Sequence, residues 1–367
     1  MTINRGDQEN SARIKVVGIG GGGSNAVSRM YRERVPGVEY IVVNTDSQAL
    51  LRSDVPLKMR IGDQLTNGKG VGGSPELGTR SAEESREDLY EVISEADMVF
   101  IAAGMGGGTG TGAAPVIAQI AKETSALTVG VVTKPFSFEG MRRARVADAG
   151  VKRLKEHVDT LLVIPNERLH VIAQEEITAE NAFKMADDVL RIGVQSIAEL
   201  VTVAGEINLD FADVNAVMRD SGPAWMSIGW GIGEHRAREA AQQAITNPLL
   251  DVSIEGARGV LFNITGGSDL KLSELHEAAE VIQRVVDPDA NIIFGMVTDL
   301  KMENELKITI IATGFPSGED YSDNEEQVDR LLSEALSSNE SKLDLPPFLR
   351  RYSRSRAGVQ ANNGQSG

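Results

Sequence analysis

Glycine-rich segments with the composition of phosphate-binding loops occur three times in the first third of the chain. They cover residues 18–23, 68–73 and 106–112. Glycine lets the backbone approach a phosphate closely, and the free N–H groups of a following helix bind anions. Several converging loops suit a triphosphate better than one dinucleotide bridge. The sequence therefore predicts a nucleotide site made largely of backbone donors.

The first loop alone also fits a dinucleotide-binding fingerprint. Gly18, Gly20 and Gly23 have the required spacing, and Asp46 follows about 20 residues on, where a ribose-binding acid is expected. An NAD-dependent Rossmann oxidoreductase is thus an alternative, although it has no use for residues 106–112. Each loop taken singly could also be a tight turn. The G-x-x-x-x-G-K-[ST] motif is absent from the sequence, which excludes a P-loop protein.

Two acids, Asp210 and Asp213, lie three residues apart at a predicted helix start and could belong to a functional site. Aspartate is equally common at the N-cap of a helix, where its side chain accepts from free N–H groups. These residues alone leave both interpretations open.

Composition excludes other classes of protein. The 367 residues suffice for two domains with tails, and the net charge of −16 argues against nucleic acid or an anionic membrane as a direct partner. The chain has no cysteine, which excludes thiolate catalysis and fits a reducing cytoplasm. Its four histidines have no metal-ligand spacing. No apolar run approaches the roughly 20 residues of a membrane span.

The first half of the chain alternates predicted strands with helices, which indicates an α/β fold with a parallel sheet. Short apolar runs predict strands at 14–18, 40–44, 98–103, 127–133 and 160–165. Residues 178–203 predict a long, largely buried helix. Beyond it, strands at 260–265, 292–298 and 308–313 with a helix at 273–286 predict a smaller α/β domain.

The predicted organisation follows from these segments. It comprises a flexible N-terminal tail (1–12), a Rossmann-like nucleotide-binding domain (13–177), a central helix (178–203), a smaller mixed-sheet domain (204–316), an acidic linker (317–342) and a C-terminal peptide with a basic tail (343–367).

The string GGGTGTG at 106–112 resembles the signature of the tubulin/FtsZ superfamily. The resemblance extends through TKPFSFEG (133–140), IPNER (164–168) and NLDFAD (208–213), and it covers the chain from Arg13 to Phe315. The length and the tail DLPPFLR at 344–350 are similar to the bacterial FtsZ family. The resemblance implies a GTPase with a GTP-binding domain, a central helix and a mixed-sheet domain. It also implies GTP and GDP as ligands, with Mg²⁺ held mainly through phosphates and water.

The resemblance implies a set of nucleotide contacts. Residues from the glycine segments would hold the phosphates, namely Gly21, Gly22, Gly23, Ser24, Asn25, Gly70, Gly72, Gly73, Gly107, Gly108, Thr109 and Gly110. Glu139 and Arg143 would face the nucleotide, and Asn166 would contact sugar or base. Phe183 and Asp187 share a helix face, where a ring could stack on guanine beside a carboxylate that accepts its N–H groups. Core packing is the alternative role for Phe183.

In this family, the loop with Asn208, Asp210 and Asp213 completes the GTP site of the next subunit. That arrangement implies head-to-tail filaments that hydrolyse GTP, and a place at the midcell division ring on the inner face of the cytoplasmic membrane. A member of the superfamily without hydrolysis is a further alternative, against which the two acids argue. Asp344 to Arg350 would bind membrane-tethering division proteins, and the following arginines could add weak contact with lipid. Folding back of this tail onto its own domain is the other possibility.

Overall fold

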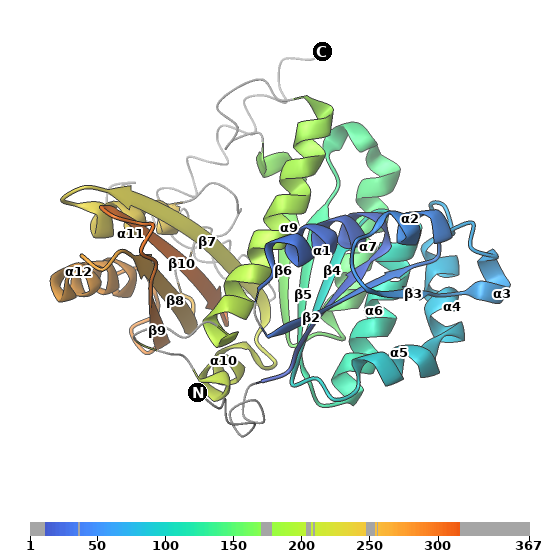
Figure 1. Cartoon of the computed structure of the whole chain (residues 1–367), viewed down its shortest axis with the longest axis horizontal. Helices are drawn as coiled ribbons and strands as arrows, with labels where there is room; N and C mark the ends of the chain where they lie inside the picture. The colour runs from blue at the N-terminus through green and yellow to red at the C-terminus, as the bar shows by residue number, and fades with distance from the viewer. Residues whose placement is uncertain are drawn as a thin grey trace, which may run out of the picture. The chain divides into compact units, whose positions relative to one another are not determined.

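The computed structural model describes residues 12–35, 37–169, 178–202, 207, 210–246, 254 and 256–315. Ten strands form a single sheet with the order β3-β2-β1-β4-β5-β6-β7-β10-β8-β9 (Figure 1). The strands are β1 (Ile14–Ile19), β2 (Val38–Asn44), β3 (Leu57–Arg60), β4 (Met98–Gly104), β5 (Leu127–Lys134), β6 (Thr160–Pro165), β7 (Gly222–Ile232), β8 (Gly259–Gly266), β9 (Asn291–Thr298) and β10 (Glu305–Thr313).

Helices cover both faces of the first six strands, which all run parallel. The helices of this part are α1 (Gly20–Glu33), α2 (Ser47–Arg52), α3 (Asp63–Thr66), α4 (Pro75–Glu84), α5 (Arg86–Ile93), α6 (Gly108–Glu123), α7 (Met141–Lys155) and the 3-10 turns η2 (Ser137–Glu139) and η3 (Asn166–Arg168). Helix α9 (Ala179–Thr202) follows them. The predicted α/β class with a parallel sheet is confirmed.

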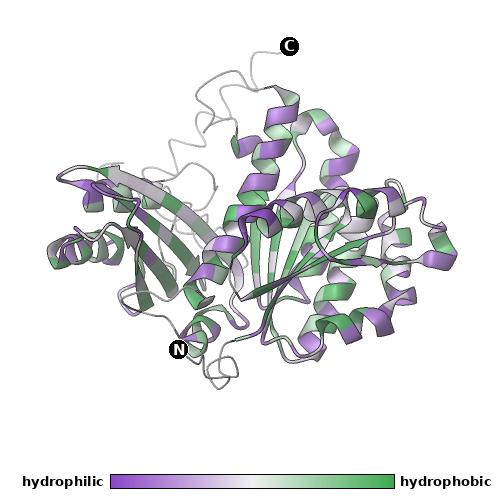
Figure 2. Ribbon diagram, in the orientation of Figure 1, coloured by the Kyte–Doolittle hydropathy of each residue, from purple (hydrophilic) through white to green (hydrophobic). Residues whose placement is uncertain are grey.

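Alternation of side chains along the strands divides the core of this part into two layers. Val16 packs with α1 and α9, whereas its neighbour Val17 packs with α5 and α6 on the other face. Parallel strands buried on both faces need continuous apolar runs, and β4 has six fully buried residues in a row. Figure 2 shows the corresponding band of hydrophobic residues along the strands.

The second part is a mixed sheet, as predicted, covered on one face by α11 (Arg236–Thr246) and α12 (Leu272–Gln283). Strand β10 is antiparallel to β7 and β8, and β8 is parallel to β9. Three residue pairs between β6 and β7 join this part to the parallel strands. The predicted strands 260–265, 292–298 and 308–313 are confirmed as parts of β8, β9 and β10.

Strand β7 was not predicted, because its sequence begins with Gly222 and Pro223 and contains further glycines. Proline is tolerated here because Pro223 is the second residue of the strand and has no partner in β10, whose pairing with β7 begins at Ala224. Gly229 is required for packing, since a Cβ atom there would lie 1.9 Å from the carbonyl oxygen of Ala240 in α11.

The long helix predicted at 178–203 corresponds to α9, which runs between the two groups of strands (Figure 1). The prediction of a largely buried helix was wrong for part of its surface. One face is buried through residues such as Leu190 and Val194, whereas Phe183 is 43% exposed. The exposure could not be predicted from the sequence, because Phe183 and Met185 are apolar yet lie near the partly exposed amino end of the helix.

The glycine segments are shorter as loops than the sequence suggested. Helix α1 already begins at Gly20, and α6 begins at Gly108, so the first and third segments lie partly in the first turns of helices, whereas the second segment remains a loop. The second glycine segment leads into α4, which is capped by Ser74. The side chain of Ser74 accepts a hydrogen bond from the Leu77 N–H, and Pro75 occupies the first helical position.

Some predictions concern residues outside the described part of the chain. These are Asn208, most of the N-terminal tail, the linker 317–342 and the C-terminal peptide 343–367. Among the helices that the structure describes, none has the length and apolar character needed to cross a membrane.

Candidate functional site

A cavity of about 450 Å³ opens at the carboxyl ends of the parallel strands. The residues of its wall come at or after the carboxyl ends of β1, β4, β5 and β6. The cavity includes the point between β1 and β4 where the strand order reverses. Ligands of open α/β sheets bind at such a position. Thirteen of the predicted nucleotide contacts line it, namely Gly21, Gly22, Asn25, Gly72, Gly107, Gly108, Thr109, Gly110, Glu139, Arg143, Asn166, Phe183 and Asp187.

Two predicted contacts of the first glycine segment, Gly23 and Ser24, do not line this cavity. Gly23 instead allows α1 to approach β4, since a Cβ atom there would lie 2.2 Å from the carbonyl oxygen of Ala102. Ser24 is only 4% exposed and lines a smaller hollow beside the cavity. Its neighbours Gly21 and Gly22 present backbone N–H groups from the first turn of α1.

The third glycine segment forms the opposite wall. Gly108, Thr109 and Gly110 belong to the first turn of α6, whose free N–H groups and positive end suit phosphate oxygens. The Gly108 N–H donates to the Gly72 carbonyl at 3.2 Å, which brings Gly72 to the rim. The Thr109 hydroxyl is 2.7 Å from that of Thr45 at the end of β2. Sequence analysis did not single out Thr45, although it follows a predicted strand.

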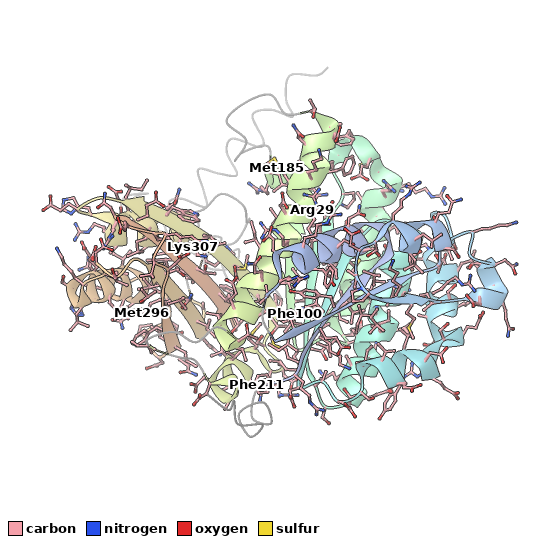
Figure 3. All side chains as sticks on the ribbon, in the orientation of Figure 1. Arg29, Phe100, Met185, Phe211, Met296 and Lys307 are labelled. Atoms are coloured by element: carbon pink, nitrogen blue, oxygen red, sulfur yellow. The ribbon has the colours of Figure 1, made fainter. Side chains whose placement is uncertain are left out.

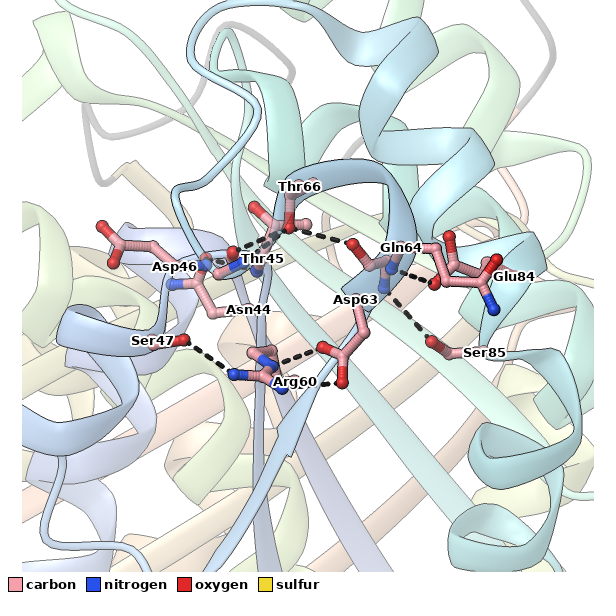
Figure 4. A network of polar contacts seen from close by, with 12 residues as sticks. Asn44, Thr45, Asp46, Ser47, Arg60, Asp63, Gln64, Thr66, Glu84 and Ser85 are labelled. Atoms are coloured by element: carbon pink, nitrogen blue, oxygen red, sulfur yellow. Dashed lines mark hydrogen bonds and ion pairs between the residues drawn. The ribbon is translucent and has the colours of Figure 1, made fainter.

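Gly70 and Gly73 lie outside the lining of the cavity. The Gly70 N–H donates to the carbonyl of Thr45 at 3.1 Å, so this residue secures the loop rather than facing the hollow. Figure 4 shows the polar network on this side, in which the Thr66 hydroxyl also donates to Thr45 at 3.3 Å.

Asp46 is the acid on which a dinucleotide interpretation depends, and it has another use in the structure. Its side chain accepts from the Gln48 N–H at 2.8 Å and caps α2. It does not line the cavity. The geometry therefore gives no support to the oxidoreductase alternative.

Glu139 and Arg143 form an ion pair on the rim. Glu139 also accepts from the Phe136 N–H at 2.9 Å, so the carboxylate is fixed at the turn η2. The guanidinium of Arg143 is half exposed and can pair with an anion as well as with Glu139.

Asn166 lies at the floor of the cavity, where β6 ends. It is 5% exposed, and its side-chain oxygen has no hydrogen-bond partner among the residues described. A buried acceptor without a donor is costly. A ligand that carries N–H or O–H groups would satisfy it, as the sugar or base of a nucleotide does.

Helix α9 provides Phe183 and Asp187. The ring of Phe183 makes edge contacts with Phe136 and Phe138, at centroid distances of 5.6 and 6.1 Å. It is nevertheless partly exposed to the cavity, so both the predicted stacking role and the packing role are compatible with its position.

The Asp187 carboxylate is held in an unusual environment. Burial raises its pKa to about 6, the charge of Arg29 lowers it, and Asp188 raises it. Arg29, which lies between α1 and α9 (Figure 3), is 3.8 Å from Asp187 and 3.3 Å from Asp188. Asp188 does not line the cavity, because it lies one residue further along the helix and points away from it.

Sequence analysis missed five lining residues, which are Gly104, Met105, Thr133, Pro135 and Ala186. Four of them stand at or just after the carboxyl ends of β4 and β5. The strand predictions already contained this signal, because parallel strand ends meet at one edge of the sheet.

Asp210 and Asp213 lie outside this cavity, at the start of α10 (Phe211–Met218). Asp210 occupies the N-cap position but makes no side-chain capping bond. Both acids are exposed, and no hydrogen bond or ion pair links either carboxylate to another described residue. Within the described chain they are therefore not used for capping.

The residues described contain no cluster of three or more acidic or histidine side chains suited to a metal ion.

Comparison with known proteins places these features in a family. A family model described as the Tubulin/FtsZ family GTPase domain matches residues 13–174, and one described as the FtsZ family C-terminal domain matches residues 222–316. An FtsZ dimer from M. jannaschii is 44% identical, with a TM-score of 0.80, over 85% of this chain and 93% of that chain. A tryptophan-to-tyrosine mutant of M. jannaschii FtsZ is 46% identical, with a TM-score of 0.80, over 84% and 92%.

A more distant match shares the fold alone. CetZ1 from Haloferax volcanii is 22% identical, with a TM-score of 0.72, over 83% of this chain and 95% of that chain. The two family models together cover both parts of the described sheet. The residues that line the cavity lie in the GTPase part, except for Phe183, Ala186 and Asp187 on the following helix α9. On this evidence the chain belongs to the FtsZ family of tubulin-like, GTP-binding GTPases that assemble into filaments and act in cell division.

Proposed function

We propose that each GTP site of this protein is completed by a second copy of the chain, and that hydrolysis requires this contact. The supporting observation is the separation of two halves of a site. The cavity offers phosphate-binding backbone groups, and the two carboxylates in its lining have other partners, since Glu139 pairs with Arg143 and Asp187 faces Arg29. Asp210 and Asp213, in contrast, are exposed and unused elsewhere in the described chain.

In this proposal the first turns of α1 and α6 bind the phosphates through backbone N–H groups. Asn166, Phe183 and Asp187 bind the sugar and guanine. Asp210 and Asp213 of the neighbouring copy, together with Asn208, orient a water molecule and polarise it for attack on the γ-phosphorus. The leaving group is GDP, and the γ-phosphoryl group becomes inorganic phosphate. Positioning and charge stabilisation supply most of the rate in phosphoryl transfer.

The lining residues include one cation, Arg143, which is already paired with Glu139. A triphosphate therefore brings more negative charge than the described lining neutralises. Mg²⁺ bound to the phosphates would supply that charge, and it would be held by the nucleotide and water with the Thr109 hydroxyl nearby.

A cavity on one copy that meets α10 on another is a heterologous contact. Such contacts produce open filaments unless rotation closes them into a ring. The M. jannaschii FtsZ structure is described as a dimer, and a CetZ2 structure from Haloferax volcanii as a protofilament. We infer that this protein forms head-to-tail filaments in the cytoplasm, at the midcell division ring.

The C-terminal peptide would connect these filaments to the membrane. Residues 344–350 combine leucine, proline and phenylalanine with a final arginine, which suits docking to membrane-tethering division proteins. Many such tails on one polymer bind with high avidity even where each contact is weak. Removing residues 343–367 is expected to leave GTP hydrolysis intact and to abolish this attachment.

Phosphate release from GTP with Mg²⁺, recorded with light scattering across protein concentrations, tests the shared site. The rate per subunit should be near zero at low concentration and rise with scattering. Replacement of Asp210 and Asp213 by alanine should lower turnover by about 10²-fold or more, the range for loss of a positioned acid or base, with GTP affinity unchanged.

The control is Asp289→Ala, which removes an exposed acid from the same part of the chain. It should hydrolyse GTP at the normal rate. A rate per subunit that does not depend on concentration, or full activity of the double variant in filaments, would contradict the shared site.

A further inference from the structure

A charged cluster at the end of α6 remote from the cavity has no part in the site described above. Lys122 lies in the last turn of this helix, whose first turn lines the cavity. Its ammonium group donates a hydrogen bond to Asp220 Oδ1 at 3.0 Å and lies 3.4 Å from Asp159 Oδ1. Asp159 precedes β6, and Asp220 lies between α10 and β7. One cation therefore joins three segments that are distant in sequence.

Asp159 is the member of the cluster whose position is fixed by the parallel sheet. It is completely buried, and its Oδ2 accepts from the Thr128 N–H at 2.8 Å. Its backbone is also bound, since its carbonyl accepts from the Gly222 N–H at 2.8 Å. A buried carboxylate requires a counter-charge, and among the described residues Lys122 provides it. The ammonium position is thus set by the parallel sheet.

The carboxyl end of α10 is attached to the same region. The carbonyl of Met218 accepts from the hydroxyls of Thr160 and Ser221, and that of Val217 accepts from the Thr313 hydroxyl at 3.0 Å. Lys122 then holds the chain two residues beyond the helix through Asp220. A helix of eight residues spans only about 12 Å, so its two ends move together.

We propose that Lys122 is a positioning residue for GTP hydrolysis. Through Asp159 and Asp220 it fixes the carboxyl end of α10 to α6, and this sets the direction in which the amino end presents Asp210 and Asp213 to the next copy. The inference rests on the proposed shared site. Helix α6 then has two roles. Its first turn forms the phosphate-binding wall of the cavity in its own copy, and its last turn supports the acids that this copy presents to the neighbouring copy.

The sharpest test is Asp220→Asn. The side chain is 72% exposed, and the backbone has a φ of 50°, a conformation that asparagine accepts readily. The substitution keeps the Lys122–Asp159 pair and removes the charge that Lys122 holds. Turnover per assembled subunit should fall about two- to fivefold, the range that an exposed ion pair supports. The KM for GTP, the GTP affinity of the monomer and the melting temperature should equal those of the wild type.

Glu123→Gln is the matched control. It breaks a somewhat less exposed ion pair on the same turn of α6, between Glu123 and Arg86 at 2.7 Å, which leads to α5 and not to α10. Its turnover should be unchanged. Lys122→Arg keeps the cation and should preserve turnover, whereas Lys122→Met should lower both turnover and the melting temperature, because the buried Asp159 loses its counter-charge.

Unchanged turnover in Asp220→Asn would overturn the inference. So would an equal loss in Glu123→Gln, or a loss accompanied by a changed KM or melting temperature. Asp210→Ala measured in the same assay separates the two proposals. Full activity of Asp210→Ala would reject the shared site itself, whereas loss in Asp210→Ala with none in Asp220→Asn would reject only the positioning role.

Discussion

Among the single residues that line the cavity, Asp187 has an environment unlike that of a surface carboxylate. It is 16% exposed, and burial raises its pKa to about 6. In the proposed site the ionised form accepts hydrogen bonds from the N1 and 2-amino groups of guanine. Protonation removes those acceptors, so GTP affinity should fall as the pH drops below 6, by up to about tenfold per pH unit.

Calorimetric titration with GTP between pH 7 and 5 checks this. Asp187→Asn should bind GTP more weakly at pH 7 and show no such dependence, whereas Asp188→Asn, outside the cavity, should keep it. Constant affinity of the wild type over this range would contradict the role given to Asp187.

The same residue should affect the stability of the ligand-free protein in the opposite direction. A carboxyl whose pKa is higher in the folded state binds more protons when folded, so its contribution to stability improves as the pH falls from 6 towards 3.8. At pH 7 the buried negative charge of Asp187 destabilises the folded state. Asp187→Asn should therefore raise the free energy of unfolding by about 1–3 kcal/mol at pH 7, measured by urea denaturation without nucleotide. Equal or lower stability would show that Arg29 compensates the charge.

At the scale of elements, two glycines in the first turn of α1 have different roles. Gly23 allows the helix to pack against β4, whereas Gly21 lines the nucleotide cavity. A Cβ at Gly23 would lie 2.2 Å from a backbone oxygen of β4, whereas a Cβ at Gly21 would meet nothing within 4 Å. Gly23→Ala should lower the free energy of unfolding by about 1–3 kcal/mol, because backbone must shift. Gly21→Ala should keep wild-type stability but weaken GTP binding, since Gly21 lines the cavity. Equal melting temperatures for the two variants would refute this.

The attachment of α11 to α12 depends on Arg236, which is buried and pairs with Glu274 and Asp269, each at 2.7 Å. The hydrogen bond from Arg236 holds the pKa of both carboxyls below their usual values. Their contribution to stability is therefore complete above their ordinary values of 4.5 and 3.8 and is lost as the pH falls through the lower folded values.

Arg236→Gln should destabilise the protein by about 3–5 kcal/mol at pH 7, because the largely buried carboxylate of Glu274 then has no counter-charge. The difference from the wild type should shrink below pH 4. Arg238→Gln, which breaks a more exposed pair with Glu277, should cost less than about 1 kcal/mol. Urea denaturation at both pH values decides, and a difference independent of pH would exclude the ion-pair explanation.

For the whole molecule, a shared site makes the activity of one copy depend on its neighbour. A fixed amount of wild-type protein above its assembly threshold is mixed with increasing amounts of a triple variant, Asp210→Ala, Asp213→Ala and Gly21→Ala, at a GTP concentration too low to fill the weakened cavity of the variant. Each variant copy that follows a wild-type copy leaves that wild-type cavity without its acids. The variant's own empty cavity adds no activity, so the rate per wild-type subunit should fall to about half in an equal mixture. Phosphate release at constant scattering measures it. A total rate that stays constant would place the full site within one chain.

The strands show how much of the secondary structure can be predicted from local sequence. Five of the six strands of the parallel part were predicted to within two residues, because burial on both faces requires continuous apolar runs that are recognisable without tertiary context. Strand β3 was missed because it is four residues long and half buried, and β7 because of Gly222 and Pro223. The chain order also says nothing of how β7 meets β6, a pairing of three residues that joins the two parts of the sheet.

The sequence by itself determined the family, the α/β class, the glycine segments and most of the residues of the cavity. It could do so because phosphate binding by backbone groups needs glycine at fixed places beside strand ends. Tertiary structure alone decided which glycines face the cavity and which, like Gly23, permit close packing. It also decided that Asp46 caps a helix, that Asp187 is buried, and that Lys122 meets Asp159 and Asp220. Each of these depends on contacts between segments far apart in the chain, and residue type and spacing carry no record of such distances.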